Sequence, residues 1–101
     1  MKFYYDLHIH SSLSPCADDD MTPNNIVNMA LIKGLDVISL TDHNSTKNVE
    51  AVHELCQHKG IKFIPGIEVQ TKEEVHVLCY FFDILDCLKF GEMIYNSLDC
   101  V

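Results

Sequence analysis

The sequence contains no arginine. Its seven basic residues are all lysines, and they stand against 15 acidic residues, which gives a formal net charge of -8 over 101 residues. Proteins that bind a nucleic-acid backbone or an anionic membrane surface use clustered lysine and arginine for that purpose. We therefore expect no direct binding of duplex nucleic acid and no docking on a membrane.

Long apolar runs and paired cysteine motifs are also missing. No stretch approaches the roughly 18 apolar residues that a membrane-spanning helix needs, and the N-terminus lacks the apolar segment of a signal peptide. The five cysteines include no Cys-x-x-Cys pair. An odd number of cysteines without such spacing is typical of free thiols in a reducing compartment, so the predicted location is the cytoplasm.

Strand-like and helix-like segments alternate along the chain, which is typical of an α/β fold with mainly parallel strands. The first helix has clear ends, because Thr22 and Pro23 are N-terminal signals and Gly34 is a C-terminal signal. We expect residues 1–101 to form a single domain. Strands are predicted at residues 3–10, 35–40, 61–64 running on to 69, and 75–82, and helices at 23–33, from 49 to the glycine at 60, and 84–96.

Polar side chains follow three of the predicted strands at the point where each strand ends. His8 and His10 end the first strand, Asp42 and His43 follow the second, and Glu68 follows the third. The carboxyl ends of parallel strands meet at one edge of a sheet, where active sites form. The two-residue period of a strand also places the two histidines of a His-x-His pair on one face.

His76 lies near the start of its strand, so it needs a separate argument. If residues 67–70 and 74–78 form a hairpin centred on Lys72, then Glu68 and His76 lie directly opposite each other. Opposed Cβ atoms in a hairpin are about 5 Å apart, close enough for both side chains to bind one ion. The predicted metal ligands are therefore His8, His10, His43, Glu68 and His76.

The ligand types restrict the ion. Histidines with carboxylates suit zinc, manganese or iron, whereas magnesium and calcium prefer oxygen ligands alone. A glutamate among histidines can bridge two ions, an arrangement used for in-line displacement at phosphorus. Such ions would activate a water molecule and neutralise phosphate oxygens, which no arginine can do in this chain.

Four ordered motifs in this chain resemble those of the PHP (polymerase and histidinol phosphatase) domain family. They are Asp6-Leu7-His8-Ile9-His10-Ser11, residues 34–43 ending in Thr41-Asp42-His43, Gly66-Ile67-Glu68 and His76-Val77-Leu78. The resemblance implies a distorted β/α barrel with two or three divalent metal ions at its C-terminal edge. It also implies a phosphoesterase that hydrolyses a phosphate-ester small molecule or nucleotide with a metal-activated water.

The resemblance assigns roles by position. His8 and His10 would bind one metal, Glu68 would bridge it to a second, and His76 would bind the second. His43 would serve a third metal position or line the site, and Asp42 would orient an imidazole, so that Glu68, His43 and Asp42 form the expected catalytic set. An acidic loop ligand is expected at Asp18, with Cys16 as the alternative, and Lys47 is the candidate contact for a phosphate.

Length is the main departure from the family, because a full PHP domain is about twice as long. The chain is therefore predicted to form about half of a PHP-type barrel, with mainly parallel strands and one hairpin. Either it assembles as a homo-oligomer or its C-terminal half is missing. The competing hypothesis for its function is a catalytically incomplete metal-binding or interaction module that acts only with a partner chain.

Overall fold

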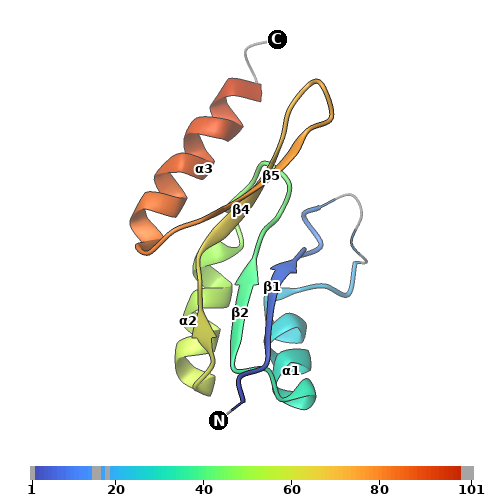
Figure 1. Cartoon of the computed structure of the whole chain (residues 1–101), viewed down its shortest axis with the longest axis vertical. Helices are drawn as coiled ribbons and strands as arrows, with labels where there is room; N and C mark the ends of the chain where they lie inside the picture. Colours follow the sequence, from blue (N-terminus) through green and yellow to red (C-terminus); the bar gives the residue numbers. More distant parts are fainter. Residues whose placement is uncertain (1, 15–16, 18, 99–101) are drawn as a thin grey trace.

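The fold is described from a computed structural model, which covers residues 2–14, 17 and 19–98. Three parallel strands form one sheet in the order β1-β2-β3, and an antiparallel hairpin, β4-β5, extends it (Figure 1). None of the described helices is long and apolar enough to cross a membrane. The elements in chain order are β1 (Tyr5–Ile9), α1 (Pro23–Lys33), β2 (Val37–Leu40), α2 (Val49–Lys59), β3 (Lys62–Phe63), β4 (Gly66–Gln70), β5 (His76–Tyr80) and α3 (Ile84–Leu98).

Helix α1 has the ends that the sequence predicts. The Thr22 hydroxyl accepts a hydrogen bond from the Asn25 N–H, and Gly34 ends the helix with a φ of 72°. Both are local signals, because a hydroxyl satisfies a free N–H in the first turn and glycine adopts the left-handed conformation without strain. Helix α2 ends in the same way at Gly60, whose φ is 75°.

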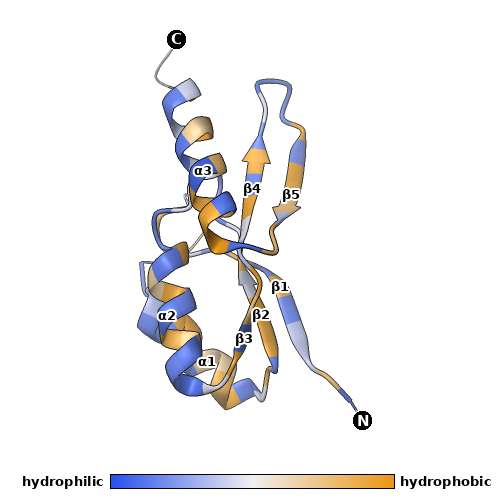
Figure 2. Cartoon of the chain, turned by 90° about the vertical axis from the view of Figure 1, so that its left-hand side faces the viewer, coloured by the Kyte–Doolittle hydropathy of each residue, from blue (hydrophilic) through white to orange (hydrophobic). Residues whose placement is uncertain are grey.

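Most of the apolar core lies between the parallel sheet and the two helices α1 and α2, and α3 adds Cys87 to it. These helices pack on the same side of β1–β3, whereas α3 packs beside β4 (Figure 2). Strand β2 lies in the middle of its sheet, is mostly apolar and has three buried residues out of four. The buried core consists of Ile26, Val27, Ala30, Ile38, Leu40, Val49, Val52, Cys56, Ile61 and Cys87.

The predicted third strand is divided into β3 and β4. Val37 pairs with Lys62 and, further along, His43 pairs with Glu68, so both parallel pairs join residues 25 positions apart in the sequence. The register of the parallel pairing is thus unchanged across Pro65, although β4 then forms its own sheet with β5. The chain therefore runs alongside β2 and the residues after it both before and after Pro65. This path places Glu68 next to the end of β2.

Strand β1 contains a bulge. Asp6 pairs with Ile38, but Ile9 pairs with Leu40, so three steps along β1 match two along β2. Residues 7–8 therefore occupy the place of one residue, which locally disrupts the ladder and redirects the neighbouring side chains. The strict alternation of faces predicted for this strand is interrupted here.

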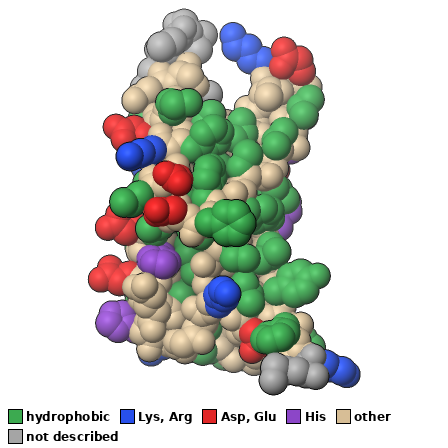
Figure 3. Space-filling view, turned by 60° about the vertical axis from the view of Figure 1, so that its left-hand side comes forward, with side chains coloured by type: hydrophobic (Ala, Val, Ile, Leu, Met, Phe, Trp, Pro, Cys, Tyr) green, Lys and Arg blue, Asp and Glu red, His purple; other side chains and the backbone are tan. Residues whose placement is uncertain are grey.

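Both outer strands have a free edge, because β1 pairs only with β2 and β5 only with β4 among the described strands. A cavity of about 430 Å³ lies between β1 and β5, lined by Leu7, Ile64, Tyr80 and Phe82 among others. Hydrophobic side chains form a band on the face shown in Figure 3. Exposed apolar side chains next to free strand edges are typical of a surface that another chain covers.

Candidate metal centre

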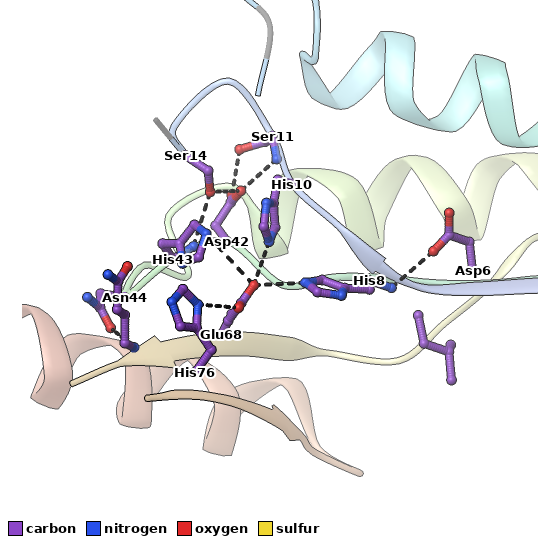
Figure 4. A network of polar contacts seen from close by, with 12 residues as sticks. Asp6, His8, His10, Ser11, Ser14, Asp42, His43, Asn44, Glu68 and His76 are labelled. Atoms are coloured by element: carbon purple, nitrogen blue, oxygen red, sulfur yellow. Dashed lines mark hydrogen bonds and ion pairs between the residues drawn. The ribbon is translucent and has the colours of Figure 1, made fainter. Parts of the chain in front are cut away.

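Four imidazoles surround the carboxylate of Glu68 (Figure 4). Glu68 lies in the middle of β4 and is only 4% exposed. Its Oε1 lies 2.8 Å from His8 Nε2 and 2.7 Å from His10 Nε2, and its Oε2 lies 2.8 Å from His76 Nδ1. His43 is the fourth neighbour, with its Nε2 at 3.8 Å from Oε1. Three chain segments, from β1, from the end of β2 and from β5, therefore meet at one buried carboxylate of β4.

The parallel pairing at the end of β2 sets the position of Glu68. The Glu68 N–H donates to the Asp42 carbonyl at 3.0 Å, and the Glu68 carbonyl accepts from the Asn44 N–H at 2.8 Å. These two bonds hold β4 against the segment that carries His43. The prediction that strand ends gather these residues at one edge is confirmed by this geometry.

The predicted pairing of the hairpin is wrong. The hairpin is centred one residue further along the chain than predicted. Glu68 lies opposite Leu78, and His76 lies opposite Gln70. The turn takes in Glu74, which has a φ of 63° and whose N–H donates to the Thr71 carbonyl, so the hairpin is centred on residue 73. Glu68 and His76 are still on one face as diagonal neighbours, within reach of each other.

The electrostatics of the cluster favour an ionised carboxylate at Glu68 and a neutral imidazole at His43. Burial by itself would raise the pKa of Glu68, but hydrogen bonds from His8, His76 and His10 outweigh it and lower the pKa to about 2. Burial is also the main reason that the pKa of His43 is lowered. Glu68 is therefore an anion at neutral pH, and His43 keeps a free lone pair for a ligand.

The donor atoms form two groups that could each hold a metal ion, and the groups share Glu68. One consists of His8, His10 and Glu68, and the other of His43, Glu68 and His76, with the ligand atoms of each group within 4.8 Å of one another. The sequence interpretation placed His43 at a third metal or on the wall of the site, whereas its position groups it with His76.

His43 provides a test of whether these residues fit a metal. Its Nδ1 is buried without a hydrogen-bond partner among the described residues, and its Nε2 is beyond hydrogen-bond distance from Glu68. An imidazole nitrogen that is buried without a hydrogen-bond partner is costly in a metal-free protein. Together with three further imidazoles and one carboxylate, it is the donor set that suits zinc, manganese or iron.

Asp42 is fully buried and anchors the loop after β1. Its Oδ1 accepts hydrogen bonds from the Ser11 N–H at 2.6 Å and from the Ser14 hydroxyl at 2.8 Å, and its Oδ2 accepts from the Ser11 hydroxyl. We expected Asp42 to contact an imidazole. It reaches the backbone of His43 through Ser14 instead, because the Ser14 hydroxyl accepts a hydrogen bond from the backbone N–H of His43 at 3.1 Å. Asp42 thus positions the backbone of His43 through Ser14.

The roles of Ser11 and Ser14 were not predicted from the sequence. Ser11 lies 31 residues from Asp42 and Ser14 lies 28 residues from it. Serines in a loop of small residues give no local sign of a buried partner so far along the chain. Only the parallel pairing of β1 with β2 brings this loop to the end of β2.

Lys47, the predicted phosphate contact, does not lie in the cluster. The ammonium group of Lys47 lies 4.0 Å from the centre of the Tyr95 ring on α3, in a cavity whose lining contains none of the clustered histidines. This cation–π contact stabilises the packing of α3. The contact of Lys47 with a phosphate stays a prediction. Asp18 and its alternative, Cys16, lie outside the described residues.

A sequence model of the PHP domain family matches residues 6–90, and the chain belongs to this family. It is 32% identical over 82 residues to a 5'-3' exoribonuclease of Haemophilus influenzae, a match that covers 78% of this chain and 29% of the relative. It is 31% identical over 78 residues to a phosphoribosyl 1,2-cyclic phosphate 1,2-diphosphodiesterase of Eggerthella lenta, covering 72% of this chain and 29% of the relative.

The fold is similar to that of a proposed metal-dependent phosphoesterase from Bifidobacterium adolescentis. The TM-score is 0.72 at 24% identity, and the match covers 95% of this chain and 33% of the solved chain. The α/β arrangement with parallel strands is thus shared with PHP-like proteins. The chain spans less than a third of the length of the curated relatives described above.

Proposed function

We propose that this chain supplies a two-metal centre for the hydrolysis of phosphate esters. The observation that supports it best is the pair of ligand groups that share the single carboxylate of Glu68. In this arrangement His8 and His10 would hold one ion, His43 and His76 would hold the other, and Glu68 would belong to the ligands of both. The ions proposed are zinc, manganese or iron, and Asp18 remains a proposed further ligand.

The chain's own residues prepare the site for this chemistry. When bound, the ions would activate a water for attack at phosphorus and neutralise the phosphoryl oxygens. Glu68 contributes an anion that offsets part of the positive charge, and Asp42 fixes the backbone beside His43. The absence of arginine leaves the phosphoryl charge to be met by metal ions and histidines.

The proposed substrate is a phosphate-ester small molecule or a nucleotide. The two curated relatives are named for RNA cleavage and for cleavage of a phosphoribosyl cyclic phosphate. RNA linkages and cyclic phosphates are both phosphodiesters, so a diester is the first substrate to test.

We also propose that the described strands form about half of a PHP-type barrel and that residues 1–101 act as one domain. A second copy of the chain or a C-terminal half would then cover the free edges of β1 and β5 and complete the site. The free strand edges and the exposed Tyr5, Tyr80 and Phe82 support this proposal.

The test measures bound metal and the hydrolysis of bis(p-nitrophenyl) phosphate and p-nitrophenyl phosphate by the reconstituted protein. Glu68→Gln and the double variant His8→Ala/His10→Ala are expected to bind metal at least 10-fold more weakly and to lose turnover. His58→Ala is the control, because His58 is exposed on α2 and lies outside both ligand groups. Wild-type protein that takes up no metal would refute the proposal, whereas bound metal without turnover would favour a module that acts only with a partner chain.

A further inference from the structure

The peptide group between Leu7 and His8 lies in the bulge of β1, where the ladder with β2 is disrupted. Side chains satisfy both of its polar groups. The His8 N–H donates to Asp6 Oδ1 at 3.1 Å, and the Leu7 carbonyl accepts from the Tyr80 hydroxyl at 2.5 Å. One peptide plane is thus held at both ends by side chains.

These two contacts come from different parts of the fold. Asp6 belongs to β1 itself (Figure 4), whereas Tyr80 lies at the end of β5, 73 residues from Leu7. The ladder with β2 continues at Ile9, whose carbonyl accepts from the Thr41 N–H at 2.7 Å. The Tyr80 hydroxyl therefore ties the hairpin to the bulge immediately before a predicted metal ligand.

His8 depends on this backbone more than the two less exposed histidines of the cluster, His10 and His43, do. Its side chain is 51% exposed and that of His76 is 44% exposed, compared with 17% for His10 and 15% for His43. Packing therefore restrains its ring less, although its Nε2 lies 2.8 Å from Glu68 Oε1. A rotation of the Leu7–His8 peptide would move the Cα–Cβ bond of His8 and turn the ring away from the carboxylate.

We propose that Asp6 and Tyr80 are positioning residues that fix the direction of His8 toward Glu68, and that they control the group formed by His8, His10 and Glu68. This inference rests on the proposed function only in treating His8 as a metal ligand. Neither side chain belongs to the two ligand groups. Residues that orient a metal ligand without contacting the metal typically weaken metal binding about 10- to 100-fold when they are removed, and we expect an effect of this size.

The variants are Tyr80→Phe, which removes only the hydroxyl, Asp6→Ala, which removes the acceptor, and Asp6→Asn, which keeps an acceptor oxygen. Tyr95→Phe is the matched control, because it removes a hydroxyl but keeps the ring that contacts Lys47. Titration of the full chain with Zn²⁺ is expected to show 10-fold or greater loss of affinity for Tyr80→Phe and Asp6→Ala, near wild-type affinity for Asp6→Asn, and no change for Tyr95→Phe.

A second measurement uses metal-free protein, so it does not depend on the proposed function. The ring nitrogen signals of His8 and His76 are recorded by NMR in each variant. We expect the His8 signals to shift in Tyr80→Phe and Asp6→Ala while those of His76 stay in place. If the wild type binds no Zn²⁺ but His8 shifts in this way, the proposed function fails and the positioning role stands.

Unchanged His8 signals in both Tyr80→Phe and Asp6→Ala would overturn the inference, as would equal shifts at His8 and His76. If Tyr80→Phe fails to fold, as judged from its backbone amide spectrum, the comparison of Asp6→Ala with Asp6→Asn decides instead. Rescue by the asparagine supports the positioning role, because asparagine keeps the acceptor oxygen that alanine lacks. A purely steric role would instead be shown by rescue in Asp6→Leu, which has a similar size but no acceptor oxygen.

Discussion

Glu68 combines two properties that rarely occur together, because it is buried and yet ionised. The imidazoles that donate to it offset the cost of burial, and they lower its pKa to about 2 from the ordinary value of 4.5. The same residue holds β4 against the end of β2 through its backbone. A change at this side chain therefore affects both stability and ligand binding.

The lowered pKa of Glu68 predicts a pH-dependent stability in metal-free protein. A carboxyl whose pKa is lower in the folded state stabilises that state above pH 4.5, and this contribution is lost as the pH falls toward about 2. We expect the free energy of unfolding to differ between wild type and Glu68→Gln by up to about 3 kcal/mol near neutral pH. Urea denaturation with EDTA at a series of pH values measures this difference. The prediction is contradicted if the difference in free energy of unfolding between the two proteins does not become smaller below pH 4.5.

The sequence predicted most of the candidate site but not how its parts are held. His8, His10, Glu68 and His76 could be found because their spacing along strands is a local property, and all four meet in the structure. The role of Tyr80 could not, because it depends on a bulge in a strand 73 residues away. Such a contact has no counterpart in a local sequence pattern.

At the scale of elements, helix ends were predicted well and strand pairing less well. Helix α1 runs over the predicted residues 23–33, because hydroxyl, proline and glycine signals act on the residues next to them. The hairpin register was missed because its turn uses Glu74 in a left-handed conformation, which sequence usually marks with glycine or asparagine. A one-residue change in the centre of a hairpin shifts every opposed pair.

The hairpin turn offers a prediction at this scale. A non-glycine residue pays about 1 kcal/mol for a positive φ such as the 63° of Glu74. We expect Glu74→Gly to raise the free energy of unfolding by about 0.5–1 kcal/mol without changing the contact of His76 with Glu68, and Glu74→Val to lower it. Urea midpoints and the His76 ring signals test both statements, and a loss of stability in Glu74→Gly would count against the turn geometry.

Gly66 lies where β4 packs tightly against residues of β2 and the position after it. A Cβ at this position would lie 2.8 Å from Ser39 Oγ and 2.8 Å from Thr41 Cγ2. We expect Gly66→Ala to lower the free energy of unfolding by about 1–3 kcal/mol because the added methyl group overpacks the core.

Ser39→Ala provides the matched control for this substitution. Its hydroxyl is buried and has no hydrogen-bond partner among the described residues, so its removal costs little. The double variant Gly66→Ala/Ser39→Ala is expected to recover part of the loss in urea denaturation. Strictly additive effects would show that the two positions do not interact.

At the scale of the whole molecule, the two free strand edges predict association. Val77 lies on β5 and is 46% exposed. We expect the protein to elute above its monomer mass of 11.5 kDa at increasing concentration, and Val77→Lys to shift it toward the monomer, because a charged edge residue opposes strand pairing. Light scattering after size exclusion measures the mass, and a wild-type monomer at all concentrations would instead favour a missing C-terminal half as the partner.

The sequence separations within the cluster have a consequence for folding. Glu68 meets His76 by closing a loop of only 8 residues, but it meets His8 by closing one of 60. Loop-closure entropy rises with the logarithm of length, so the longer closure costs about 2 kcal/mol more. As the chain orders, the contact with His76 therefore forms before the contact with His8, and hydrogen exchange is expected to show later protection of β1 than of the β4–β5 hairpin. A complete ligand set then reports that the entire chain has folded.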